Sequence, residues 1–178
     1  MLKLRKEEGK MIPPEMTALE ILALAVKSEI DAANFYRRLS ARVKADLLRQ
    51  KINFLVSEEK KHRQVLLRLS RQRFGRGPEP LPAKGITPGF TLSSWKNLTL
   101  LELFAIALKA ERAAEAFYSE ARKVVKDDLA GRILDYLRRV ERSHAALILS
   151  EVDLLRRFPE YYDIAGFHFG DEFVHIGP

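Results

Sequence analysis

The 178-residue chain contains no cysteine. This absence excludes disulfide bonds, cysteine-ligated zinc, iron–sulfur clusters and an iron site held by four thiolates within the chain. Long apolar stretches are also missing, because the longest runs span only about six residues, as in 21–26, far fewer than a transmembrane helix needs. The N-terminal residues 1–10 lack the apolar segment of a signal peptide. We therefore expect a cytoplasmic protein that does not enter membranes.

The charge balance is basic, with a formal net charge of +7. The basic side chains alternate with acidic ones, as in residues 58–61 and 138–141, which is typical of solvated helix faces. This pattern does not favour nucleic acid as a partner. DNA protection by a basic oligomer is an alternative function, and it predicts DNA binding that collapses with salt.

The two halves of the chain share a repeat with a constant shift of 82 residues (111 − 29, 141 − 59 and 144 − 62). Each half carries one glutamate followed by a Glu-x-x-His motif. The repeated residues are Glu29, Glu59 and His62 in the first half and Glu111, Glu141 and His144 in the second. Flanking residues keep the same shift, since Phe35-Tyr36 recurs as Phe117-Tyr118. The repeat therefore indicates a duplicated structural unit.

Helical spacing of apolar residues and the absence of sustained strand alternation predict four long helices. The expected helices cover residues 17–43, 46–74, 99–125 and 128–158. Thr17 and Thr99 each precede a glutamate by three residues, which predicts two capping boxes. Asp46 is expected to cap the second helix, and Pro159 to stop the fourth.

Short turns within each half predict two antiparallel helical hairpins, 17–74 and 99–158. The Pro- and Gly-rich segment 75–98 is a long crossover and not a domain boundary, because neither hairpin can bury its apolar face alone. The fold class predicted is therefore all-α, with residues 1–158 forming one four-helix bundle. A crossover of this length also permits the hairpins to exchange between two chains.

The tail, residues 159–178, breaks the helical period and is rich in aromatic residues. We expect it to pack on the bundle or on a second subunit, and we expect a homodimer. A second metal site through His168 and His175 is the alternative interpretation of the tail.

The spacing of the repeated residues predicts a metal site. About 14 residues separate Glu29 from the end of its helix, and about 13 separate the start of the next helix from Glu59, so both lie roughly 20 Å from the turn. The same arithmetic holds in the second half. Four carboxylates and two imidazoles thus face inward at one level, which is what a bundle needs to hold two metal ions. The alternative is a helical repeat with surface carboxylates and no metal.

Charge favours the metal-bound interpretation, because four clustered carboxylates repel one another and two divalent ions contribute +4 against −4. Carboxylate and imidazole ligands suit iron and manganese, and zinc also fits the set. Tyr36 and Tyr118 lie seven residues beyond Glu29 and Glu111, so each can donate a hydrogen bond to a ligand carboxylate. Core tyrosines with other partners are the alternative.

The paired motifs resemble those of the ferritin-like superfamily and, within it, the rubrerythrins. The resemblance covers residues 17–158 and rests on Glu59-Lys-Lys-His62, Glu141-Arg-Ser-His144, Glu29 with Phe35-Tyr36, and Glu111 with Phe117-Tyr118. It implies a di-iron centre in which Glu59 and Glu141 bridge the irons and the other four residues complete the ligand set. Rubrerythrins reduce hydrogen peroxide to water with electrons from a rubredoxin domain.

The chain departs from the rubrerythrin pattern at two points. It lacks a cysteine-ligated domain, so a rubredoxin-like protein would have to supply electrons from outside. Ala114 stands where rubrerythrins carry a further glutamate, and whether the neighbouring Glu115 reaches the metals stays open. The function expected is reduction of hydrogen peroxide or dioxygen in oxidative-stress defence. The alternatives are a ferroxidase or iron-handling protein and a metal-dependent structural bundle without turnover.

Overall fold

The computed structural model describes residues 12–13, 15–86 and 95–162. Four long helices occupy most of these ranges, and no strand occurs within them. The elements are α1 (Ala18–Arg42), α2 (Asp46–Phe74), the short 3-10 helix η1 (Trp95–Asn97), α3 (Leu100–Val124) and α4 (Asp128–Arg157). The four helices agree with the sequence prediction to within one or two residues at each end.

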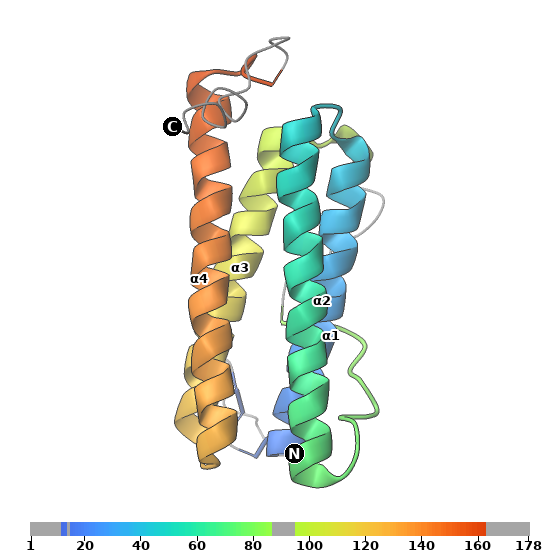
Figure 1. Ribbon diagram of the computed structural model, residues 1–178, viewed down its shortest axis with the longest axis vertical. Coiled ribbons are helices and arrows are strands. Elements are labelled where there is room, and N and C mark those ends of the chain that lie inside the picture. The colour runs from blue at the N-terminus through green and yellow to red at the C-terminus, as the bar shows by residue number, and fades with distance from the viewer. Residues whose placement is uncertain (1–11, 14, 87–94, 163–178) are drawn as a thin grey trace, which may run out of the picture.

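The helices form two antiparallel hairpins, α1 with α2 and α3 with α4 (Figure 1). α2 ends at one end of the bundle and α3 begins at the other, so that α3 runs antiparallel to α1 and α4 antiparallel to α2. The predicted all-α bundle of two repeated hairpins joined by a long crossover is therefore confirmed. None of the described helices has the length and apolar character needed to span a bilayer.

Both predicted capping boxes are present. The Thr17 hydroxyl accepts a hydrogen bond from the Glu20 backbone N–H, and the Glu20 carboxylate accepts one from the Thr17 N–H at 2.8 Å. Thr99 and Glu102 make the same pair of bonds at the start of α3. Equivalent residues of the repeat therefore begin the first helix of each hairpin with the same pair of hydrogen bonds.

The prediction that Asp46 caps α2 was wrong. Ala45 occupies the N-cap position without a side-chain bond, and Asp46 is the first helical residue, where its carboxylate pairs with Arg49. In the second hairpin the equivalent N-cap is Asp127, whose carboxylate accepts a bond from the Ala130 N–H at 2.8 Å. The repeat therefore keeps the helix start but not the capping residue.

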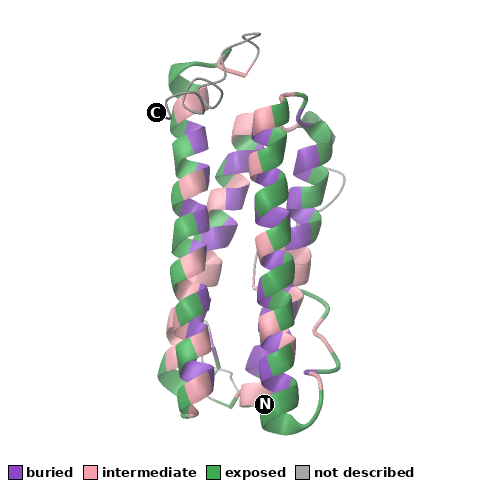
Figure 2. Ribbon diagram, viewed as in Figure 1, coloured by how far each residue is buried: buried purple, intermediate pink, exposed green. Residues whose placement is uncertain are grey.

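The apolar core consists of two clusters, one toward each end of the bundle. Phe35, Leu48, Phe104 and Ile148 belong to the cluster near the α1–α2 turn. The second cluster lies near the α3–α4 turn and includes Leu22, Leu66, Phe117, Tyr118 and Leu137. Buried residues line the inner faces of the helices along the length of the bundle (Figure 2). The repeated polar residues fall between the two clusters in sequence on every helix.

The crossover and the start of the tail are attached to the helices by polar contacts. The Ser28 hydroxyl accepts a bond from the Ile86 N–H at 2.7 Å, and a Cβ on the adjacent Gly85 would lie 2.7 Å from the Ser28 hydroxyl, so only glycine fits there. The Lys51 ammonium lies 2.5 Å from the Glu151 carboxylate, which also accepts a bond from Tyr162. His168, His175 and the rest of the predicted tail after Tyr162 lie outside the described residues.

Candidate metal centre

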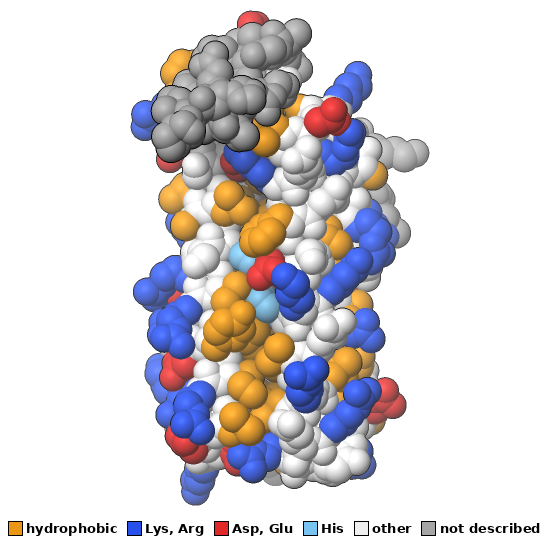
Figure 3. Space-filling model, viewed as in Figure 1, with side chains coloured by type: hydrophobic (Ala, Val, Ile, Leu, Met, Phe, Trp, Pro, Cys, Tyr) orange, Lys and Arg blue, Asp and Glu red, His pale blue; other side chains and the backbone are white. Residues whose placement is uncertain are grey.

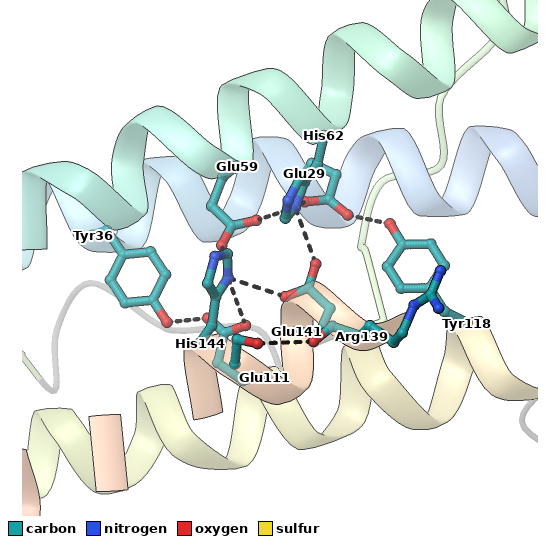
Figure 4. Close-up of polar contacts among 10 residues, drawn as sticks. Glu29, Tyr36, Glu59, His62, Glu111, Tyr118, Arg139, Glu141 and His144 are labelled. Carbon is teal, nitrogen blue, oxygen red and sulfur yellow. Dashed lines mark hydrogen bonds and ion pairs between the residues drawn. The ribbon is translucent and has the colours of Figure 1, made fainter. Parts of the chain in front are cut away.

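The structure brings together all six residues that the repeat singled out. Glu29 comes from α1, Glu59 and His62 from α2, Glu111 from α3, and Glu141 and His144 from α4 (Figure 4). Each of the six has an exposed fraction of 3% or less. Four helices thus contribute to one buried polar layer between the two apolar clusters.

Local helix geometry explains this convergence. Residues three apart on a helix share a face, so each Glu-x-x-His motif directs its carboxylate and imidazole to the same side. The single glutamates on α1 and α3 are buried for the same reason as their neighbours Ala25, Ala33, Ala107 and Ala110, since all lie on the face that packs inside the bundle. The small alanines leave room at this level for the polar side chains.

The six residues form two groups whose oxygen and nitrogen atoms lie within 4.8 Å of one another. Glu29 and His62 belong to one group, while Glu111 and His144 belong to the other. Both groups contain Glu59 and Glu141. The arrangement therefore offers two adjacent positions for a metal ion, each with two shared carboxylates, one carboxylate of its own and one imidazole of its own.

The contacts of the two histidines mirror each other. His62 Nδ1 lies 3.1 Å from Glu141 Oε1, and His144 Nδ1 lies 3.1 Å from Glu59 Oε1. Each histidine thus approaches the glutamate of the opposite motif more closely than that of its own, at 3.5 Å for His62 with Glu59 and 3.4 Å for His144 with Glu141. The imidazole rings stack at 5.4 Å between centroids. The site is therefore close to two-fold symmetric.

Several of these buried polar atoms have no hydrogen-bond partner. They are Oε1 of Glu59 and Glu141 and both ring nitrogens of His62 and His144. Buried polar atoms are almost always paired, because an unpaired one costs about 1–3 kcal/mol. The unpaired Oε1 atoms of Glu141 and Glu59 lie 3.1 Å from the unpaired Nδ1 atoms of His62 and His144, so an ion bound beside each pair would satisfy both atoms. The donor set thus fits two metal ions.

Two tyrosines join the ligand glutamates of opposite hairpins. The Tyr36 hydroxyl on α1 donates to Glu111 on α3, and the Tyr118 hydroxyl on α3 donates to Glu29 on α1. Burial, together with the nearby carboxylates, raises the pKa of both tyrosines well above the usual value, so the hydroxyls keep their protons. The sequence placed each tyrosine on the same helix as one glutamate, but the glutamate that it contacts lies across the bundle.

The electrostatics of the metal-free layer favour protonated groups. Burial is the largest cause that raises the pKa of Glu111 to about 8, and repulsion from Glu141 is the second. The same two causes raise the pKa of Glu59 well above its usual range. Burial lowers the pKa of His144, but contacts with Glu111 and the other carboxylates outweigh it and raise the pKa to about 12. The pKa of His62 is raised in the same way. Without metal, the layer therefore balances its charges with protons.

Two glutamates beside the ligand set have different surroundings. The Glu115 carboxylate lies 2.7 Å from Arg142 and belongs to neither group of potential ligands. Glu58, which sequence analysis did not single out, offers an oxygen within 4.8 Å of ring nitrogens of His62 and His144. Its one sequence signal is its place beside Glu59 in the motif.

Comparison with known proteins agrees with this geometry. The Rubrerythrin family model matches residues 20–152. The chain belongs to the rubrerythrin family. A solved structure with a similar fold is that of a hypothetical protein from Pyrococcus furiosus, which is 32% identical to this rubrerythrin-family chain with a TM-score of 0.70. The alignment covers 83% of this chain and 98% of the other. No curated protein matches the chain.

Membership of the rubrerythrin family confirms that the four-helix bundle is ferritin-like. The buried carboxylate and histidine groups form a candidate di-metal site within the matched residues.

Proposed function

We propose that the protein is a di-iron oxidoreductase that reduces hydrogen peroxide or dioxygen with electrons from an external donor. The observation that carries this proposal is the buried layer of four carboxylates and two imidazoles, arranged in two groups that share Glu59 and Glu141. Iron and manganese are the redox metals that suit this ligand set, whereas zinc would occupy it without redox chemistry. Membership of the rubrerythrin family favours iron.

In this proposal both ion positions would draw on Glu59 and Glu141, because each of these glutamates belongs to both groups. Glu29 with His62 and Glu111 with His144 complete the two positions. Tyr36 and Tyr118 hold the unshared carboxylates in place by donating hydrogen bonds. When bound, two ferrous ions supply the two electrons that, with two protons, convert one hydrogen peroxide to two water molecules.

Burial supports a small substrate. The six ligand residues are 3% exposed or less, so a large organic molecule could not reach them without opening the bundle. Hydrogen peroxide and dioxygen are small enough to pass between side chains. The apolar clusters on either side of the layer exclude bulk water and so strengthen the electrostatic interactions within it.

The chain contains no cysteine, so none of its own residues can form a thiolate electron-transfer centre. We propose a rubredoxin-like protein as the electron donor. We also propose that the chain forms a homodimer, which measurement of the native mass would test. These parts of the proposal are independent of the ligand assignment.

The test compares Glu59→Ala with Glu115→Ala in protein reconstituted with ferrous iron without oxygen. Glu59 belongs to both groups, so its loss should remove tight binding of two irons and abolish peroxide consumption. Glu115 is a partly exposed glutamate in an ion pair with Arg142, and its loss should change neither iron binding nor peroxide consumption. Wild-type peroxide turnover in Glu59→Ala would refute the assignment.

A further inference from the structure

The inner ligand set is repeated in both halves of the chain, but Glu58 is not. The shift of 82 residues places Val140 at the equivalent position (58 + 82 = 140) and Ser143 opposite Lys61 (61 + 82 = 143). The Glu58–Lys61 ion pair, with 2.7 Å between the ammonium and the carboxylate, therefore occurs on α2 without an equivalent on α4. A feature that breaks an otherwise symmetric site needs an explanation of its own.

Glu58 is partly exposed and lies close to both histidines. Its side chain is 16% exposed, and a carboxylate oxygen lies within 4.8 Å of ring nitrogens of His62 and His144. Figure 3 shows atoms of the described histidines reaching the surface along the seam between α2 and α4, with an acidic side chain beside them and apolar side chains on either side. Atoms of the two imidazoles, although almost fully buried, can thus be seen from solvent at this seam.

The second ring nitrogen of each imidazole, Nε2, has no hydrogen-bond partner. His62 and His144 turn Nδ1 toward the inner carboxylates, at 3.1 Å from Glu141 and Glu59 respectively. The two nitrogens of an imidazole point in divergent directions, so each Nε2 points away from the inner contacts. Both Nε2 atoms are buried without a hydrogen-bond partner. Two imidazole nitrogens and one carboxylate oxygen are ligands typical of divalent iron, cobalt or zinc.

We propose that Glu58, His62 and His144 form an outer loading position, through which divalent transition-metal ions reach the inner site from the seam between α2 and α4. The inference rests on the proposed metal-binding function of the inner site. An ion that binds an imidazole through Nε2 displaces the proton carried there, and a second ion on Nδ1 of the same ring would require the loss of the other ring proton as well. The outer position is therefore occupied only before the inner positions fill, and the final stoichiometry stays at two ions.

Lys61 opposes this loading step. Its ammonium group holds the Glu58 carboxylate, and an incoming cation has to displace it. The Lys61 side chain is 64% exposed, so it can move into solvent when the cation arrives. Removing Lys61 should accordingly speed metal uptake, whereas removing Glu58 should slow it.

The experiment follows Co²⁺ uptake by the metal-free protein in a stopped-flow spectrometer, because bound Co²⁺ absorbs visible light and uptake needs no oxidant. Glu58→Ala should take up the ion about tenfold more slowly than the wild type, the scale of an electrostatic effect on association. Its final stoichiometry should remain two, and Lys61→Ala should load faster than the wild type. Glu115→Ala is the matched control, since Glu115 is also a partly exposed glutamate paired with a basic residue.

Equal uptake rates in Glu58→Ala and Glu115→Ala would overturn the proposal. A final stoichiometry below two in Glu58→Ala would also overturn it, because Glu58 would then be an inner ligand. A wild-type protein that binds no Co²⁺ would instead refute the inner metal site. Normal Co²⁺ loading with no peroxide turnover in the iron form would refute only the proposed reaction.

Discussion

Filling the inner site with two divalent ions at pH 7 should release about four protons per chain. Metal ligands have to be deprotonated before they bind, so metal uptake displaces every proton that the metal-free layer holds. Raised pKa values keep both histidines charged at this pH, with that of His144 at about 12. Glu111, with a pKa of about 8, is also protonated, and burial and repulsion from Glu141 raise the pKa of Glu59 in the same direction, which favours a proton there. The sum is two protons from imidazoles and two from carboxyl groups.

The number of protons should depend on pH in a defined way. Between pH 7 and pH 9 the free Glu111 carboxyl loses its proton, because its pKa of about 8 lies within this interval. Proton release on metal binding should therefore fall from about four to about three. The apparent affinity for metal should rise with pH, by about a factor of ten per pH unit for each proton released.

Calorimetric titration with Zn²⁺ measures this release directly. The observed heat is compared in two buffers that differ in enthalpy of ionisation, and the difference gives the number of protons exchanged. Zinc is suitable because it has no redox chemistry. Glu115→Ala should release the same number of protons as the wild type. A release of one proton or fewer at pH 7 would refute the charge distribution described for the metal-free layer.

Two further predictions concern the same layer. The pKa of Glu111 rises from 4.5 to about 8 on folding, so the folded metal-free protein holds a proton that the unfolded chain loses, and the histidines act with the same sign. This stabilisation is complete below the unfolded pKa values and declines as pH rises, by about 1.4 kcal/mol per pH unit for each such proton. The melting temperature of metal-free protein, followed by circular dichroism in chelator, should therefore fall between pH 5 and pH 9, and a rise would contradict the pKa directions. Tyr36→Phe removes the hydrogen bond to Glu111 and should weaken metal binding about tenfold in competition with a chromophoric chelator. Tyr136→Phe, at an exposed tyrosine on α4, should bind like the wild type, and equal affinities in both variants would show that the Tyr36 bond does not support the ligand.

Most of the fold could be predicted from local patterns. Apolar spacing, the capping boxes at Thr17 and Thr99, and the crossover rich in proline and glycine define four helices and their order. The constant shift between the halves then brings six polar residues to one level, because the helices of each hairpin have nearly equal lengths. The N-cap of α2 was predicted wrongly. The aspartate that recurs in both halves, Asp46 and Asp128, is the first helical residue in each case, and the N-cap is the residue before it.

Features that depend on how the hairpins meet could not be predicted in the same way. Tyr36 and Tyr118 were expected beside ligand carboxylates, but which carboxylate each one contacts depends on the packing of α1 against α3. Glu58 lies outside the repeated pattern, and its distance to His144 depends on the packing of α2 against α4. Contacts between segments distant in sequence carry no local signal in a single sequence.

The mirrored contacts of the two hairpins bear on how such a chain could originate. Each hairpin holds half of the ligands, and each histidine and tyrosine contacts a glutamate of the other half. Two copies of one ancestral hairpin, related by the same two-fold axis, would present all six ligands without a crossover. Gene fusion then frees the two halves to diverge. The glutamate at position 58 opposite the valine at position 140 is such a divergence, available to a fused chain but not to a pair of identical hairpins.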